Sequence, residues 1–199
     1  MKAHGKEGII KGSMQQVFQV GIIMVVAVIL LVLPRIALAA ATAKSINRDV
    51  DNALQNLYQT TPAAKDLSKI AKGILVFPSI IKGGLIVGGQ YGEGALRVGG
   101  KTTGYFKTVS ASYGLQAGAQ SFGYALFFID RKGLDYLKKS SGWEIGVEPS
   151  LVIVDEGMAR TLSTTTVKSG IYAFFFNQKG LMAGLTIQGS KITKITPGK

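Results

Sequence analysis

The sequence has no cysteine and only one histidine among its 199 residues. Without cysteine the chain can form no disulfide, offers no thiolate nucleophile and has no Cys-ligated metal site. Acidic residues are also scarce, with 11 Asp and Glu against 23 Lys and Arg, which gives a formal net charge of +12. The hydrophobic fraction of 47% excludes a disordered chain, and the length suits one domain that buries most of its apolar surface.

The N-terminal 39 residues have the pattern of a secretory signal peptide. Three lysines precede an apolar run from Val20 to Leu33, and an Ala-x-Ala sequence ends at Ala39. This pattern predicts export with cleavage near Ala39. The alternative is an uncleaved anchor, which would place Arg35 inside the hydrophobic layer at a cost of about 2.5–3.5 kcal/mol. We expect residues 1–39 to be a signal peptide and residues 40–199 to form one domain in the periplasm or elsewhere in the cell envelope.

Removal of this segment lowers the formal charge from +12 to +9, because it holds four basic residues and one acidic residue. It also removes His4, so Ser-His-Asp and Cys-His catalysis and histidine-based metal sites are excluded from the exported chain. A carboxylate pair could still serve a glycosidase, but the candidate acids lie in turn-like or charge-mixed sequence. These acids are Asp130, Asp135, Glu144, Glu148, Asp155 and Glu156. We expect no enzymatic activity, no metal and no cofactor.

Two helices are predicted at the start of the exported part. Apolar residues from Ile46 to Leu57 form one stripe of a helix that Ser45 can cap. A second helix begins at Pro62, a residue that suits the first helical position, and Gly73 is placed to end it.

The rest of the chain has the pattern of strands and turns. Short segments rich in β-branched and aromatic residues alternate with Gly, Asn, Asp and Ser. Asp130 can cap one short helix, which Lys138 and Lys139 end. The predicted fold class is α+β: a strongly curved antiparallel β-sheet or barrel-like meander with two N-terminal helices and one short inserted helix. Long helices do not alternate with strands, which argues against a doubly wound nucleotide-binding sheet.

Glycines recur in three related stretches. The pattern Gly-Leu-x-Val-Gly-x-Gln at 84–90 is echoed at 114–120 and, in part, at 180–184. We interpret each copy as a strand in which residues i and i+4 point to the same face. Their small side chains would allow sharp coiling of the sheet or close approach of another backbone. The expected structural glycines are Gly84, Gly88, Gly92, Gly94, Gly114, Gly118, Gly180 and Gly184.

A possible phosphate loop occurs where Gly100-Lys101-Thr102 matches the end of a Walker A motif. Ala95 occupies the position of the first glycine in that motif, and its β carbon hinders the tight turn around phosphate. We therefore prefer a Gly-Gly-Lys β-turn and expect no nucleotide binding.

Basic residues outnumber acidic ones seven to two between positions 65 and 107. Near an anionic membrane each cation contributes about 1 kcal/mol within a Debye length. The alternative is a positive surface that only maintains solubility. The candidate lipid-binding residues are Lys65, Lys69, Lys72, Lys82, Arg97, Lys101 and Lys107. Residues 130–160, with six acids and five bases, are typical of an ordinary mixed surface.

Three segments resemble the SYLF family, also called the Ysc84 actin-binding domain family, and especially its exported bacterial branch. They read AKGILVFPSIIKGGLIVGGQYGEGAL, ASYGLQAGAQSFGYALFFID and GIYAFFFNQKGLMAGLTIQGSKI, and the resemblance covers about residues 45–197. Many members carry a Gly-Pro-x-Gly turn after the PSLVIV strand, whereas this chain has Asp155-Glu156-Gly157-Met158.

The resemblance implies a lipid-binding module without catalytic residues. Eukaryotic relatives bind phosphoinositides, and some bind actin filaments. For an exported bacterial chain the property that transfers is affinity for an anionic phospholipid membrane. Two rivals remain at this point. The positive charge permits nucleic-acid binding, against which export argues. The glycine-rich face could instead accept an envelope protein partner, which would make the protein a structural or interaction scaffold.

Overall fold

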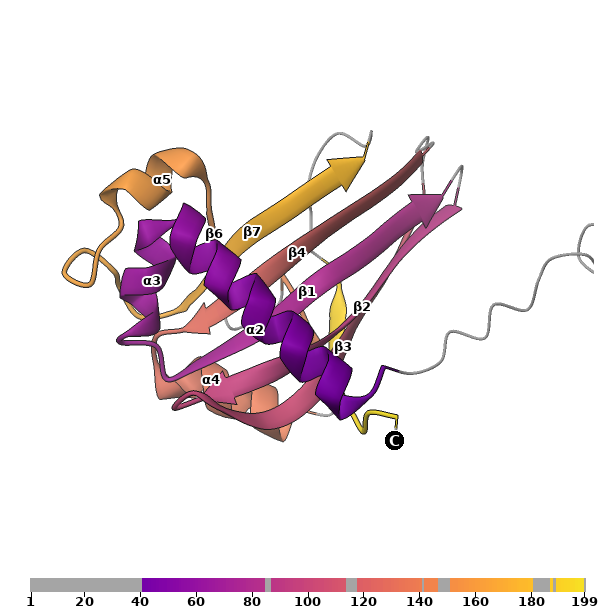
Figure 1. The fold of residues 1–199 in the computed structure, drawn as a ribbon, viewed down its shortest axis with the longest axis horizontal. Helices are drawn as coiled ribbons and strands as arrows, with labels where there is room; N and C mark the ends of the chain where they lie inside the picture. Colours follow the sequence, from indigo (N-terminus) through magenta and orange to yellow (C-terminus); the bar gives the residue numbers. More distant parts are fainter. Residues whose placement is uncertain are drawn as a thin grey trace, which may run out of the picture. The chain divides into compact units, whose positions relative to one another are not determined.

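A strongly curved mixed sheet forms the centre of the fold (Figure 1). The computed structural model describes residues 41–84, 87–113, 118–140, 142–146, 151–180, 187 and 189–198. The eight strands in these ranges are β1 Gly73–Gly84, β2 Val87–Val98, β3 Lys101–Tyr113, β4 Gly118–Phe128, β5 Trp143–Glu144, β6 Leu151–Val154, β7 Ile171–Gly180 and β8 Lys191–Ile195. Their order is β5-β8-β3-β2-β1-β4-β7-β6, and neighbours are antiparallel except β6 and β7, which are parallel.

Curvature brings strands that are far apart in the sheet into contact across its concave face. Trp143 on the edge strand β5 packs against Phe128 of β4, with 6.2 Å between the ring centroids. The hydroxyl of Tyr124 on β4 donates to Thr108 Oγ1 on β3 at 3.0 Å, although β1 and β2 lie between these strands. The predicted α+β fold with a strongly curved sheet is therefore confirmed. The sheet is mixed, because β6 is parallel to β7, and its strand order is not that of a simple meander.

The helices described are α2 Ala43–Thr60, α3 Pro62–Ser68, α4 Arg131–Lys139 and α5 Glu156–Thr161. The hydroxyl of Thr42 accepts a hydrogen bond from the Ser45 backbone N–H, so α2 begins before the residue that we expected to cap it. Pro62 is the first residue of α3, as predicted, but α3 ends at Ser68 rather than near Gly73. Asp130 caps α4 as predicted.

Helix α5 was not predicted. It follows β6 directly. The side chain of Asp155 accepts a hydrogen bond from the backbone N–H of Met158 at 2.8 Å, which satisfies one of the free donors of the first turn. This acidic cap permits a short helix at this position.

Apolar side chains pack on both faces of the sheet. The convex face is covered by α2 and α3, whose residues Val50 and Leu67 are fully buried against it. Leu134 and Leu137 of α4 pack on the concave face together with Trp143. Phe174 and Phe176 belong to the convex side and Phe175 to the concave side, so this triplet serves core packing on both faces.

The first glycine-rich stretch reverses direction between two strands and does not form a single strand. β1 ends at Gly84 and β2 begins at Val87, and Gly84 lies opposite Gly88 on the neighbouring strand. In the same way β3 ends at Tyr113 and β4 begins at Gly118. The predicted structural residues Gly114 and Gly184 lie outside the described ranges. The reading of the first copy as one strand was wrong, because Gly84 on β1 pairs with Gly88 on β2. Residues 114–117 of the second copy and 181–184 of the third copy lie outside the described ranges.

A bulge in β1 explains the requirement for two of the predicted structural glycines. The register shifts between Phe77 and Ile80, so this central strand passes through Pro78 with one extra residue. A β carbon on Gly94 would overlap the carbonyl oxygen of Val76, and one on Gly92 would overlap Ile80. Small residues thus allow β2 to approach the bulged strand closely, as we predicted for glycines of this motif.

The chain ends of the described domain are joined. Thr42 forms an isolated parallel bridge with Gly198, and the Gly198 N–H donates to the Ala41 carbonyl at 3.1 Å. At the same end of the sheet as the start of β1, Gly99 and Gly100 both have positive φ, as in a type I′ hairpin turn. This confirms the predicted turn at the Walker-like sequence. In the ranges that the structure describes, no helix is both long and apolar enough to cross a membrane.

Candidate functional site

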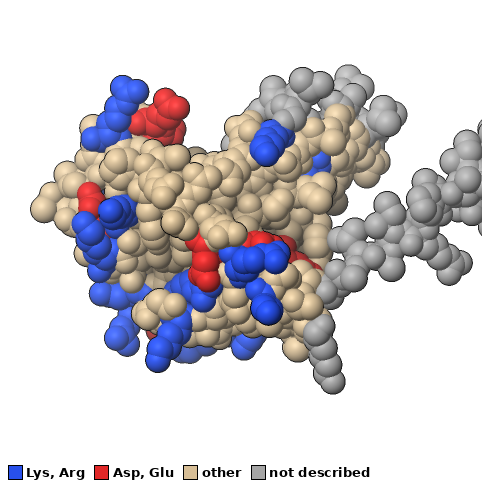
Figure 2. Space-filling view, in the orientation of Figure 1, with Lys and Arg blue, Asp and Glu red and all other residues tan. Residues whose placement is uncertain are grey.

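Exposed cations gather at one end of the sheet, which we call the basic end. Its members are Lys72, Lys101, Arg131, Lys132, Lys138 and Lys139. β1 and β4 are antiparallel, with Gly73 opposite Phe128, so the start of β1 and the helix that follows β4 lie together. The β2–β3 turn, which Lys101 follows, reaches the same end because Arg97 pairs with Ile74. Figure 2 shows the blue side chains along the lower left of the molecule, where α3, α4 and the start of β1 meet.

Helix α4 supplies four of the six cations and orients them outward. Its apolar residues are buried in the concave core, so the opposite side of the helix faces solvent. Tyr136 on that side is 43% exposed and lies one turn from both Lys132 and Lys139. Among the described residues no salt bridge neutralises a member of the basic end. An exposed aromatic ring between cations is typical of residues at a membrane interface.

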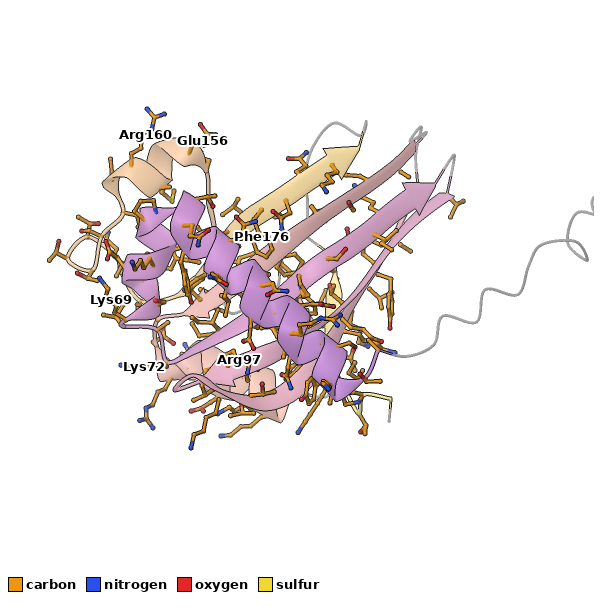
Figure 3. All side chains as sticks on the ribbon, viewed as in Figure 1. Lys69, Lys72, Arg97, Glu156, Arg160 and Phe176 are labelled. Atoms are coloured by element: carbon orange, nitrogen blue, oxygen red, sulfur yellow. The ribbon has the colours of Figure 1, made fainter. Side chains whose placement is uncertain are left out.

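The predicted lipid-binding cations do not form one cluster. Lys72 and Lys101 belong to the basic end. Lys69, which is close to Lys72 in Figure 3, forms an exposed ion pair with Asp66 at 2.7 Å. Lys65 is exposed on α3.

Arg97 is held within the domain. Its Nη2 lies 2.5 Å from Asp51 Oδ1, and its Nη1 donates to Thr102 Oγ1 at 2.5 Å. Only 13% of its side chain is exposed, beneath α2 (Figure 3). These contacts join the middle of α2 to the β2–β3 hairpin, and Arg97 is thus not available as a free surface cation.

The remaining two predicted cations, Lys107 and Lys82, lie away from the basic end. Lys107 is half-buried on β3, directly opposite Glu93 of β2. Lys82 is half-buried near the far end of β1, between its cross-strand neighbours Gln90 and Gln120. The seven residues are therefore distributed over both ends of the sheet.

No protein-family model and no curated protein sequence matches this chain. The resemblance to the SYLF family stays a prediction, and we infer function from the geometry of the basic end.

The two glutamines beside Lys82 form a buried polar cluster on the concave face. Gln90 Nε2 donates to Ser190 Oγ at 2.6 Å, and both residues are buried. Gln120 is only 2% exposed, yet neither its Nε2 nor its Oε1 has a hydrogen-bond partner among the described residues. In the same ranges no group of three His, Asp or Glu side chains is placed to hold a metal ion.

Sequence reasoning missed the contribution of α4. Residues 130–160 contain almost equal numbers of acids and bases, so this stretch resembled an ordinary mixed surface. In the structure Asp130 caps α4 and the acids of α5 lie on another element, which leaves Asp135 as the one acid among the nine residues of α4. The local signal was the cap at Asp130 followed by two pairs of cations on a short helix.

Proposed function

We propose that the protein is a non-enzymatic lipid-binding protein of the cell envelope, which attaches to anionic phospholipid through the basic end. The observation that carries this proposal is the outward side of α4, where exposed cations surround Tyr136 beside Lys72 and Lys101. The predicted signal peptide and the resemblance to exported SYLF proteins support the same function from the sequence.

The charge of the basic end is sufficient for reversible attachment. Each cation near an anionic surface contributes about 1 kcal/mol, so six cations opposed by Asp135 provide roughly 4–6 kcal/mol before ordering costs. This attraction acts within a Debye length, which falls from about 10 Å at 0.1 M salt to about 3 Å at 1 M. Attachment through the basic end must therefore weaken strongly as the salt concentration rises.

Liposome co-sedimentation across a series of phosphatidylglycerol contents tests the proposal. We expect binding to rise with the phosphatidylglycerol fraction and to be lost at high salt, with little binding to neutral phosphatidylcholine. The double variant Lys132→Glu/Lys139→Glu places two negative charges beside Tyr136 and should weaken binding at least about 100-fold, because it removes two attractive charges and adds two repulsive ones.

A matched control variant carries the same change of net charge on another element. Lys44→Glu/Arg48→Glu reverses two exposed cations of α2 and should leave binding within about threefold of the wild-type value. If both double variants lose binding equally, net charge rather than the basic end controls attachment. If the wild-type protein ignores lipid charge, the proposed function is wrong, and recovery of an envelope protein in a pull-down would then favour the scaffold function.

A further inference from the structure

At the end opposite the basic end, α2 leaves part of the convex face of the sheet uncovered. Figure 1 shows β1, β4 and β7 continuing past α2 toward the upper right. We call this uncovered part the tip face. Direct cross-strand pairs define one row on it, and such partners project to the same side of a sheet. The row reads Lys179–Ser121–Ile81–Tyr91–Val109–Lys191.

This row belongs to the convex side of the sheet. Tyr91 lies at alternate positions with Glu93 and Ala95 along β2, so all three side chains project in one direction. Ala95 is part of the core beneath α2, and the Glu93 carboxylate accepts a hydrogen bond from the backbone N–H of Ala41, just before α2. The tip face is therefore the direct continuation of the surface that α2 covers elsewhere.

The centre of the tip face is apolar and exposed. Ile81 is 65% exposed and Val109 40%, and Val87, on the same side of β2, is 66% exposed. The next row outward contains only small residues: Ala119, Gly83, Gly89 and Ala111. Three branched apolar side chains thus project from a smooth surface, a combination that is costly in water and marks an interaction site.

The charges at the margins of the tip face indicate the chemistry of its partner. Lys179 and Lys191 end the row on β7 and β8, which are five strand spacings apart, or roughly 24 Å along the sheet. Glu93 is the acid next to the row, and its carboxylate is already bonded by the Tyr91 hydroxyl and the Ala41 N–H. An apolar centre with a tyrosine and widely spaced lysines matches a bilayer, in which acyl chains adjoin anionic headgroups.

A second copy of this chain fits the tip face less well. Two copies that meet through this surface bring Lys179 and Lys191 of each into one interface, and the described residues of the face hold no free acid to neutralise them. Removal of such charges from water without partners is costly. Charge complementarity therefore favours an anionic lipid surface.

The tip face and the basic end point in different directions. β1 alone has 12 residues, which is roughly 40 Å of extended chain between the two ends. Helix α4 packs on the concave side, whereas the tip face belongs to the convex side. One flat bilayer cannot lie against both surfaces at the same time.

We propose that the tip face inserts into a second anionic lipid surface, so that the protein bridges two bilayers. This inference rests on the proposed function, because the basic end must hold the first bilayer. Attachment at the basic end depends mainly on charge, with a single tyrosine among the cations. Attachment at the tip face instead combines three apolar side chains with two lysines. The two contacts can therefore be separated by substitution.

The experiment mixes two populations of phosphatidylglycerol vesicles that carry donor and acceptor dyes, and follows clustering by energy transfer and light scattering. Wild-type protein should cluster the vesicles. The triple variant Ile81→Ser/Val87→Ser/Val109→Ser should still co-sediment with vesicles but should need at least about tenfold more protein for the same clustering. The control Ile153→Ser/Met158→Ser removes exposed apolar groups from elsewhere on the domain and should cluster like the wild type.

Insertion can be measured directly because the chain has no cysteine. A polarity-sensitive fluorophore on Val87→Cys should shift to the blue when anionic vesicles are added, whereas the same probe on Thr165→Cys, an exposed loop position, should not. Circular dichroism of each variant verifies that it is folded, and the Val87 probe keeps the test decisive if the triple variant fails to fold.

Several outcomes would overturn the inference without touching the proposed function. One such outcome is wild-type protein that co-sediments with vesicles but never clusters them. The others are a folded triple variant that clusters vesicles normally and a probe at position 87 whose fluorescence does not shift to the blue. Sedimentation velocity without lipid covers the remaining case: a wild-type dimer that the triple variant abolishes would assign the tip face to a second copy. Wild-type protein that does not co-sediment would instead refute the proposed function.

Discussion

The buried amide of Gln120 leads to the prediction that one substitution in the core makes the protein more stable. Replacement by methionine keeps a flexible side chain of similar length but removes both polar atoms, neither of which has a hydrogen-bond partner among the described residues. A buried polar group without a partner costs about 1–3 kcal/mol, so we expect Gln120→Met to raise the free energy of unfolding by about that amount. For a chain of this size each kcal/mol corresponds to roughly 2–4 °C in Tm.

The control is Gln90, the other glutamine that lies beside Lys82. Gln90 is also buried but donates to the buried Ser190 Oγ, so Gln90→Met removes a hydrogen bond of 2.6 Å. We expect this variant to lose about 1–3 kcal/mol. Urea unfolding of both variants, with equal m values, measures the two effects on one scale. If Gln120→Met is destabilised as much as Gln90→Met, the Gln120 amide is satisfied in the folded protein and the reasoning is refuted.

Three further predictions concern the sheet and its margins. Gly94→Ala should lower the free energy of unfolding by about 3 kcal/mol or more, because the new β carbon overlaps a carbonyl oxygen of β1. The control Gly89→Ala should change it by less than about 0.5 kcal/mol, because the nearest atom to its new β carbon is 3.5 Å away. Thermal unfolding compares the two variants. Arg97→Met should lose about 1–3 kcal/mol in urea unfolding, yet vesicle binding per folded molecule should be unchanged; a loss of binding in folded protein would return this residue to the lipid surface. Burial, the hydrogen bond to Glu93 and the charge of that carboxylate raise the pKa of Tyr91 to about 12. Because the pKa of tyrosine in the unfolded chain is about 10, the stability that Tyr91 contributes is complete below about pH 10 and is lost as the pH rises toward 12. Tyr91→Phe should therefore reduce the loss of stability at alkaline pH. An unchanged midpoint of alkaline unfolding would contradict the raised pKa of Tyr91.

Local sequence signals predicted the helices best. Asp130 and the lysine pair at 138–139 delimited α4, because a side-chain cap and a C-terminal charge act within one turn of the residues they affect. Pro62 marked the start of α3 for the same reason. The start of α2 was displaced, because Thr42 and Ser45 are both good caps and their competition is not decided by propensity alone.

Features that depend on the register of distant strands were not predictable in this way. The pairs Gly84–Gly88 and Gly83–Gly89 show that one glycine-rich stretch changes direction, although its alternation equally fits a continuous strand. The basic end arises because β1 starts beside the end of β4, two segments about 55 residues apart in sequence. A count of charges along the sequence therefore did not reveal this cluster, because its cations come from separate segments that only the fold brings together.

The contact between Thr42 and Gly198 has a consequence for the order in which the domain can form. This pair joins positions at the two ends of the described domain, so it has nearly the largest sequence separation that the fold allows. A nascent chain emerges with its N-terminus first, so this contact can close only after residue 198 has emerged. Contacts of such separation slow folding, because loop closure precedes any gain from the contact. The bridge between Thr42 and Gly198 is thus among the last contacts of the domain that can form.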